Sequence, residues 1–106
     1  MKICVSAMGG SLEDRVSERF GRAPYFIIVD SETMEFVSIM NEAVNMQGGA
    51  GPEAVRQIVE QKANIVLTGD LGPNARAALE SAGIKGVTGI SGNKTVRQAV
   101  EEYIKK

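Results

Sequence analysis

The sequence contains no histidine, the side chain that most often serves as a general base or as a transition-metal ligand. A catalytic triad of serine, histidine and aspartate therefore cannot form. The single cysteine, Cys4, excludes an internal disulfide and any cysteine pair that would bind a metal or carry redox chemistry. These absences favour a binding protein over an enzyme.

The sequence also lacks a large excess of charge of either sign and has no long apolar run. The net charge of -1 gives no strongly basic face for nucleic acid, and no apolar run approaches the roughly 18 residues of a membrane helix. No signal peptide precedes the first predicted strand. With 43% hydrophobic and 24% charged residues, the composition is typical of one globular domain over residues 1–106. We therefore expect a cytoplasmic protein that binds neither nucleic acid nor membranes.

The apolar pattern predicts three strands, followed by three helices that alternate with two further strands. The predicted strands cover residues 2–8, 25–29, 35–41, 65–67 and 85–88, and the predicted helices follow Pro52, Pro73 and Thr95. The resulting order, β-β-β-α-β-α-β-α, indicates an α/β fold with right-handed crossovers in its βα units. Its third strand is more polar and is expected near an edge of the sheet.

Two similar glycine turns each lead through a proline into a predicted helix. Residues 48–54 read Gly-Gly-Ala-Gly-Pro-Glu-Ala, and residues 69–75 read Gly-Asp-Leu-Gly-Pro-Asn-Ala; residues 89–93 form a looser third copy. Proline suits the first turn of a helix, and glycine lets backbone N–H groups approach a ligand closely. Because helix N-termini attract anions, we expect these turns to form an anion site at the carboxyl edge of the sheet.

A purely structural explanation of the turns stays open, because any α/β protein needs turns and this sequence pattern makes one. Neither turn matches a Walker A loop or a GxGxxG motif, so nucleoside triphosphates are not expected. The long polar connection over residues 9–24 contains Arg15, Arg19 and Arg22. These arginines either supply paired hydrogen bonds to an anion or form ion pairs with acidic residues of the same loop.

The candidate site thus combines backbone amides with guanidinium groups. Its predicted binding residues are Gly9, Gly10, Arg19, Arg22, Gly48, Gly49, Gly51, Gly69, Asp70 and Gly72. Asp70 is the only acid on a glycine turn, and helix capping is its simpler interpretation. Sulfur ligands for a metal would come from Met8, Met46 or Cys4, although such side chains more often fill a core.

Several segments together resemble the dinitrogenase iron-molybdenum cofactor binding family, which includes NifX, NafY and the C-terminal domain of NifB. The most specific similarity lies in residues 17–26, Ser-Glu-Arg-Phe-Gly-Arg-Ala-Pro-Tyr-Phe, and above all in the segment from Phe20-Gly21 to Phe26. The glycine turns and Gly83-Ile84 extend the resemblance over nearly the whole chain. Family members often carry a histidine immediately before the Phe-Gly pair, where this chain has Arg19.

The resemblance implies a ribonuclease H-like three-layer αβα fold with a mixed five-stranded sheet. It also implies a non-enzymatic carrier that holds an anionic iron–molybdenum cofactor, or an iron–sulfur cluster precursor, between donor and acceptor proteins. One alternative is a small-anion or protein-interaction module without a metal cofactor. Another is a divalent-metal nuclease or phosphatase, which needs several carboxylates around its ions, whereas the first predicted strand contains no acid.

Overall fold

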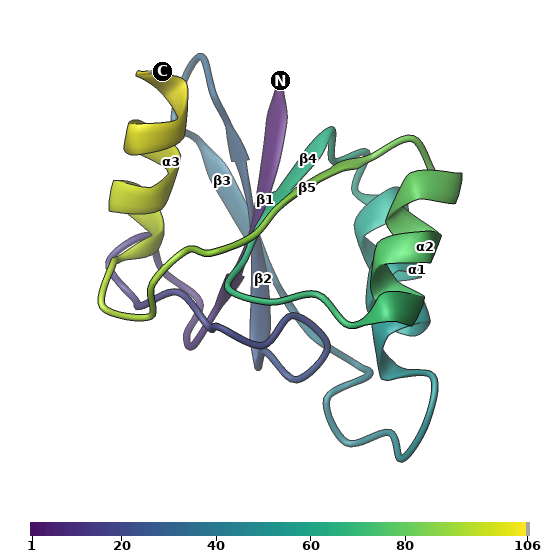
Figure 1. Cartoon of the computed structure of the whole chain (residues 1–106). Coiled ribbons are helices and arrows are strands. Elements are labelled where there is room, and N and C mark those ends of the chain that lie inside the picture. The colour runs from purple at the N-terminus through teal and green to yellow at the C-terminus, as the bar shows by residue number, and fades with distance from the viewer. Residues whose placement is uncertain (106) are drawn as a thin grey trace.

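The computed structural model describes residues 1–105, whose five strands form one mixed sheet between two helical layers. The elements are β1 (Lys2–Ala7), β2 (Tyr25–Asp30), β3 (Phe36–Met40), α1 (Ala50–Glu60), β4 (Ile65–Leu67), α2 (Pro73–Ser81), β5 (Lys85–Val87) and α3 (Val96–Ile104). Helices α1 and α2 lie on one side of the sheet and α3 on the other (Figure 1). The predicted class, element order and three-layer ribonuclease H-like arrangement are confirmed.

The strand order β3-β2-β1-β4-β5 places the predicted anion-binding turns at one edge of the sheet. Strands β1, β4 and β5 are mutually parallel, and β2 runs antiparallel to both β1 and β3. Four strands therefore end at the lower edge in Figure 1, from which the connections to α1 and α2 start. The predicted edge position of β3 is confirmed, because β3 pairs with β2 alone.

The sheet is buried on both faces because side chains alternate along each strand. In β2, Phe26 and Ile28 point into the core beneath α1 and α2, whereas Ile27 and Val29 point into the core beneath α3. Burial on both faces explains why β2 is apolar throughout. A strand with one face in water would instead alternate polar and apolar residues.

The helix boundaries depend on glycine and proline. Helix α1 begins at Ala50, before the predicted start, because Gly49 adopts a left-handed φ of 73° and serves as its N-cap. Pro52 is tolerated inside the first turn, where N–H groups have no acceptor within the helix. Helix α2 begins at Pro73, and α3 begins with a capping box of Thr95 and Gln98; both starts follow the prediction.

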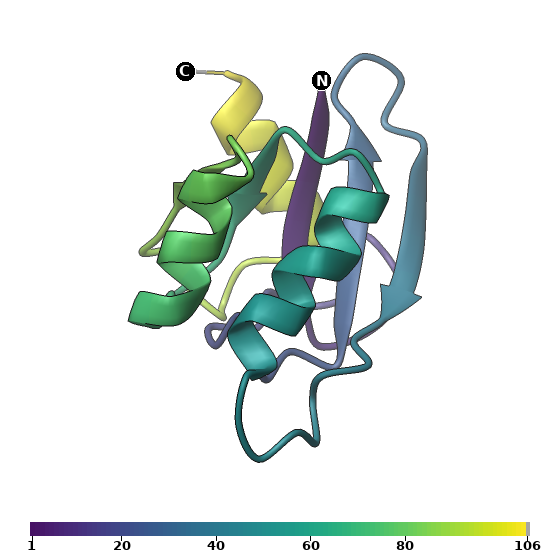
Figure 2. The same ribbon diagram turned by 90° about the vertical axis from the view of Figure 1, so that its right-hand side faces the viewer.

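The helices of the described part of the chain are short. None within residues 1–105 is long and apolar enough to cross a membrane. Figure 2 shows α1 and α2 side by side across the sheet, with the loop of residues 41–49 projecting below the start of α1. The two helix N-termini thus point toward the same edge of the sheet.

Candidate functional site

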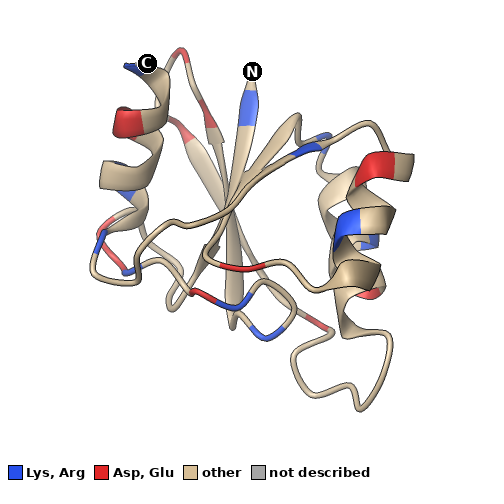
Figure 3. Cartoon of the chain, viewed as in Figure 1, with Lys and Arg blue, Asp and Glu red and all other residues tan. Residues whose placement is uncertain are grey.

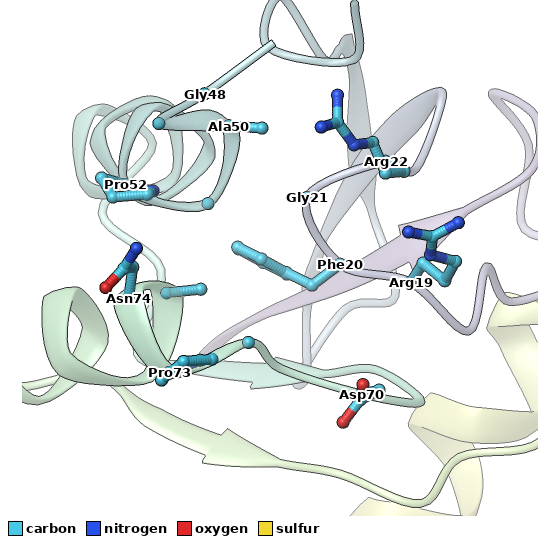
Figure 4. A pocket seen from close by; sticks show the side chains of 14 residues that line it. Arg19, Phe20, Gly21, Arg22, Gly48, Ala50, Pro52, Asp70, Pro73 and Asn74 are labelled. Atoms are coloured by element: carbon cyan, nitrogen blue, oxygen red, sulfur yellow. The ribbon is translucent and has the colours of Figure 1, made fainter. Parts of the chain in front are cut away.

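A cleft of about 310 Å³ opens where the N-termini of α1 and α2 face the connection between β1 and β2. Its walls come from residues 19–22, residues 48–52, and Asp70 with residues 72–75 (Figure 4). The cleft therefore gathers both predicted glycine turns and two of the three predicted arginines. Elsewhere, acidic and basic residues are interspersed over the elements (Figure 3).

Small residues allow the three walls to approach one another. A Cβ atom added to Gly51 would lie 2.9 Å from the Cβ of Ala75, closer than side-chain carbons normally come. A Cβ added to Gly21 would lie 3.4 Å from the backbone nitrogen of Gly51. The first turns of α1 and α2 therefore pack directly together, and the loop at Gly21 rests on the start of α1.

Four backbone N–H groups at the two helix starts have no hydrogen-bond acceptor among residues 1–105. They belong to Ala50, Gly51, Asn74 and Ala75. The first N–H group of α1 that bonds to its N-cap is that of Glu53, which donates to the Gly49 oxygen at 3.1 Å. In α2 it is that of Arg76, which donates to the Gly72 oxygen at 3.0 Å. Free N–H groups and the positive ends of two helix dipoles together favour an anion in the cleft.

The two arginines of the cleft have different surroundings. Nη1 of Arg22 donates to the carbonyl oxygens of Val44 at 3.1 Å and Met46 at 2.6 Å, and so holds the loop of residues 41–49. The guanidinium of Arg19 makes no hydrogen bond or ion pair within the part of the chain that the structure describes. Arg19 therefore has its whole guanidinium available to a ligand, whereas one nitrogen of Arg22 is committed to the loop.

The alternative of ion pairs within the loop is wrong for these arginines. Glu13 instead pairs with Arg97 at 2.6 Å, and Glu18 accepts a hydrogen bond from the N–H of Gly92 at 2.7 Å. Asp14 accepts from the N–H and the hydroxyl of Ser11. The acidic residues of the connection thus bind other partners, and its arginines have no ion pair among the described residues.

Asp70 lies on the rim of the cleft, between it and a neighbouring hollow of about 460 Å³. Its backbone oxygen accepts from the N–H of Phe20 at 3.3 Å, which joins the two loops. Its carboxylate caps no helix, because the N-cap of α2 is Gly72 and makes no side-chain bond. The capping interpretation of Asp70 is therefore wrong.

Three of the predicted site residues lie outside the cleft. Gly9 packs beside Asp14, and Gly10 lies beside Ser38 and Tyr25. The chain turns back here, because the N–H of Met8 donates to the oxygen of Arg15 at 2.9 Å. Gly9 and Gly10 are thereby carried away from the helix N-termini.

Gly69, the third of these residues, borders only the neighbouring hollow. A Cβ added there would lie 2.6 Å from the backbone of Glu18. Its missing side chain therefore lets two loops cross and does not open space for a ligand.

No cysteine, histidine or methionine lines the cleft, which bears on the predicted metal ligands. Met8 is exposed outside it, and Met46 lies in the adjoining loop, with its Cε near Gly49. Cys4 is fully buried in the core beneath α1 and α2. Within residues 1–105, no three His, Cys, Asp or Glu side chains gather in a group suited to a metal ion.

Burial also raises the pKa of the Cys4 thiol far above its ordinary value, because the thiolate would lose its hydration. A raised pKa in the folded state stabilises the fold below the pKa of the unfolded thiol, roughly 8.5, and this stabilisation is lost as pH rises above it. Relative to Cys4→Ala, the free energy of unfolding should fall by about 1.4 kcal/mol per pH unit above pH 9. Urea denaturation of both proteins from pH 7 to 10 measures this difference, and parallel curves would contradict it.

Several residues that complete the cleft were not predicted from the sequence. Gly21 and Ala75 were not selected, although each removes bulk where two backbones meet. Asn74 adds a free N–H at the start of α2. The available signal was the repetition between the two turns, because Ala75 follows its proline at the same interval at which Ala54 follows Pro52.

Comparisons with known proteins show the family and the fold. The model of the family described as dinitrogenase iron-molybdenum cofactor matches residues 1–106. The apo form of the orange protein from Desulfovibrio gigas is similar, with a TM-score of 0.94 and 40% identity over 98% of this chain and 87% of that chain. A NifB-like protein from Thermotoga has a TM-score of 0.84 and 30% identity, again over 98% and 87% of the two chains. A search of curated proteins finds no match.

Proposed function

Because this chain belongs to the dinitrogenase iron-molybdenum cofactor family, we propose that it is a non-enzymatic carrier of an anionic metal–sulfur cofactor. The cargo is the iron–molybdenum cofactor or an iron–sulfur cluster precursor, and the binding site is the cleft between α1 and α2. The observation that carries this proposal is the convergence in one cleft of four N–H groups and the Arg19 guanidinium, all without a partner among residues 1–105.

The donor set favours an anion with several exposed acceptor atoms. Sulfide or oxygen atoms of a cluster can accept hydrogen bonds from the amides of Ala50, Gly51, Asn74 and Ala75 at the same time. The guanidinium of Arg19, at the opposite wall, adds a charged group that can donate two parallel hydrogen bonds. A single small anion would reach only part of this set.

The cleft walls supply no sulfur or imidazole ligand, so the cargo must keep its own ligands on its metal atoms. Binding then depends on hydrogen bonds and charge. Release breaks no bond between metal and protein, which suits a carrier that passes cargo from a donor to an acceptor protein. We place this exchange in the cytoplasm, in keeping with the sequence expectation.

A small-anion module is the second candidate, because the same amides would hold an oxoanion without any metal. A divalent-metal nuclease receives no support, since residues 1–105 bring no three potential ligand side chains together. The cluster carrier and the small-anion module differ in the size of the anion that they bind, and a titration distinguishes them.

The test is an anaerobic titration of the apo-protein with isolated iron–molybdenum cofactor, with a simple iron–sulfur cluster and with molybdate. Absorbance and co-migration on a sizing column report binding. The carrier proposal predicts stoichiometric uptake of a cluster and much weaker binding of molybdate. Uptake of molybdate alone would favour the small-anion module, and no uptake at micromolar protein would contradict both.

Gly72→Asp gives this titration a variant that alters the site without straining the fold. Gly72 has an extended backbone, φ −67° and ψ 164°, and an added Cβ would meet no atom within 4 Å. A carboxylate there should weaken cluster binding by about tenfold or more, because it opposes the anion at close range. Ser31→Asp adds the same charge in the turn between β2 and β3 and should leave binding unchanged. Equal weakening by both variants would remove the cleft as the binding site.

A further inference from the structure

Strand β3 presents an unprotected apolar edge. Phe36, Val37 and Met40 are 42%, 53% and 70% exposed. The strand pairs residue by residue with β2, without a bulge. It contains no charge and no proline, although these are the features that commonly shield an edge strand from further pairing.

The outward hydrogen-bonding groups of β3 belong to alternate residues. The residues that flank the strand both bond on the β2 side: the oxygen of Glu35 accepts a hydrogen bond at 2.9 Å, and the N–H of Asn41 donates one at 3.0 Å. Because bonding alternates along an antiparallel strand, the N–H and C=O groups of Phe36, Ser38 and Met40 point away from the sheet. This edge can therefore accept one more strand.

A first hollow, of about 190 Å³, lies at the start of β3 on the face that α1 covers. It is lined by Val37 together with Asp30, Glu35 and Lys2. The N–H of Glu32 donates to the Asp30 carboxylate and lowers its pKa, which keeps it ionised. This hollow is lined by two carboxylates and the Lys2 ammonium group, and the N-terminal ammonium group also acts on the Asp30 carboxylate.

A second hollow, of about 320 Å³, lies on the same face at the end of β3. It is lined by Ile39 and Met40 together with Gln57, Glu42 and Glu60. The Glu60 carboxylate pairs with Arg56 at 2.7 Å, whereas Glu42 makes no ion pair among the described residues. Each end of the edge therefore presents two carboxylates on the same face, and among the described residues only that of Glu60 is ion-paired.

We propose that β3 is the docking site for an extended segment of a partner protein in which basic residues alternate with apolar ones. Side chains on one face of a strand recur every second residue, and four residues span about 13 Å. Two basic side chains four residues apart would reach the two hollows, while the apolar side chains between them, two residues apart, would lie on the other face beside Ser38 and either Phe36 or Met40. A second copy of this chain fits less well, because its β3 carries no basic side chain to meet these carboxylates.

The direct test uses the peptide Thr-Lys-Val-Thr-Val-Lys-Thr and a counterpart with glutamate in place of both lysines. Amide hydrogen exchange of the protein is measured at about 1 mM peptide. The basic peptide should slow exchange at Phe36, Ser38 and Met40, and it should bind about tenfold more tightly than the acidic one, because two charge pairs change sign. Protection by both peptides equally, by neither, or by raised protein concentration alone would overturn the proposal.

Ser38→Pro tests the edge itself. Proline removes the outward N–H of Ser38 but leaves the bonds on the β2 side, as prolines of edge strands do. Peptide binding should fall at least tenfold, with the circular dichroism spectrum retained, whereas Ser38→Ala should bind like the wild type. Val37→Lys, which adds a charge at an exposed position without changing the backbone, should also weaken binding of the basic peptide. Unchanged binding by Val37→Lys would overturn the proposal even if Ser38→Pro does not fold.

Discussion

Replacing Arg19 with alanine is expected to lower the affinity for an anionic cluster by roughly tenfold to a hundredfold, the range for losing a hydrogen bond to a charged group. Arg19 lies on the cleft wall, and its guanidinium has no partner within residues 1–105. The substitution therefore removes a ligand contact without leaving another protein group unpaired. Anaerobic titration monitored by absorbance measures the affinity.

Arg15→Ala is the matched control for this prediction. Arg15 is an exposed arginine of the same connection, has no ion pair among the described residues and does not line the cleft. Its removal makes the same change in net charge and should leave affinity within about twofold, because distant surface charges are screened. If both variants lose affinity equally, binding depends on net charge rather than on Arg19.

Phe20→Ala is expected to lower the free energy of unfolding by about 3–5 kcal/mol, the usual cost of deleting a buried phenylalanine ring. Phe20 is 1% exposed and packs against Phe26 with ring centroids 5.1 Å apart. The ring anchors the loop that carries Arg19 and Gly21, so cluster binding should weaken as well. Urea denaturation followed by circular dichroism gives the free energy.

Phe36→Ala is the control for this second prediction. The Phe36 ring, on the edge strand β3, is 42% exposed, and its loss should cost about 1 kcal/mol or less. Phe20→Leu, which keeps much of the buried volume, should recover most of the stability lost in Phe20→Ala. A cost for Phe20→Ala no greater than that for Phe36→Ala would contradict the anchoring role.

Much of the fold could be predicted because strand and helix periods are local properties of the sequence. The order of strands and helices followed from the apolar pattern, and the start of the last helix was correctly placed after Thr95. The start of α1 was misplaced because a left-handed Gly49, rather than Pro52, defines its first turn. The residue at which α1 starts depends on how α1 packs against α2 at Gly51, and the spacing of residues in the sequence does not encode that packing.

The candidate site was predictable where a turn leads directly into a helix. The turns before Pro52 and Pro73 do line one cleft, because parallel strands end at one edge of the sheet. The path of the connection between β1 and β2 was not predictable, because distant backbone groups fix it. Its return toward Ser38 removes Gly9 and Gly10 from the cleft, and the carbonyl oxygens around Met46 occupy Arg22.

Backbone amide mapping by NMR shows whether cargo binds at the paired N-termini of α1 and α2. Labelled apo-protein would be titrated anaerobically with isolated iron–molybdenum cofactor, and the shift or broadening of every backbone amide recorded. We expect the largest changes at Ala50, Gly51, Asn74 and Ala75, and Gly72→Asp should reduce them at a cofactor concentration that only partly saturates the wild type. Changes centred on Gly9 and Gly10, or on the helix α3, with those four amides unaffected, would contradict this expectation.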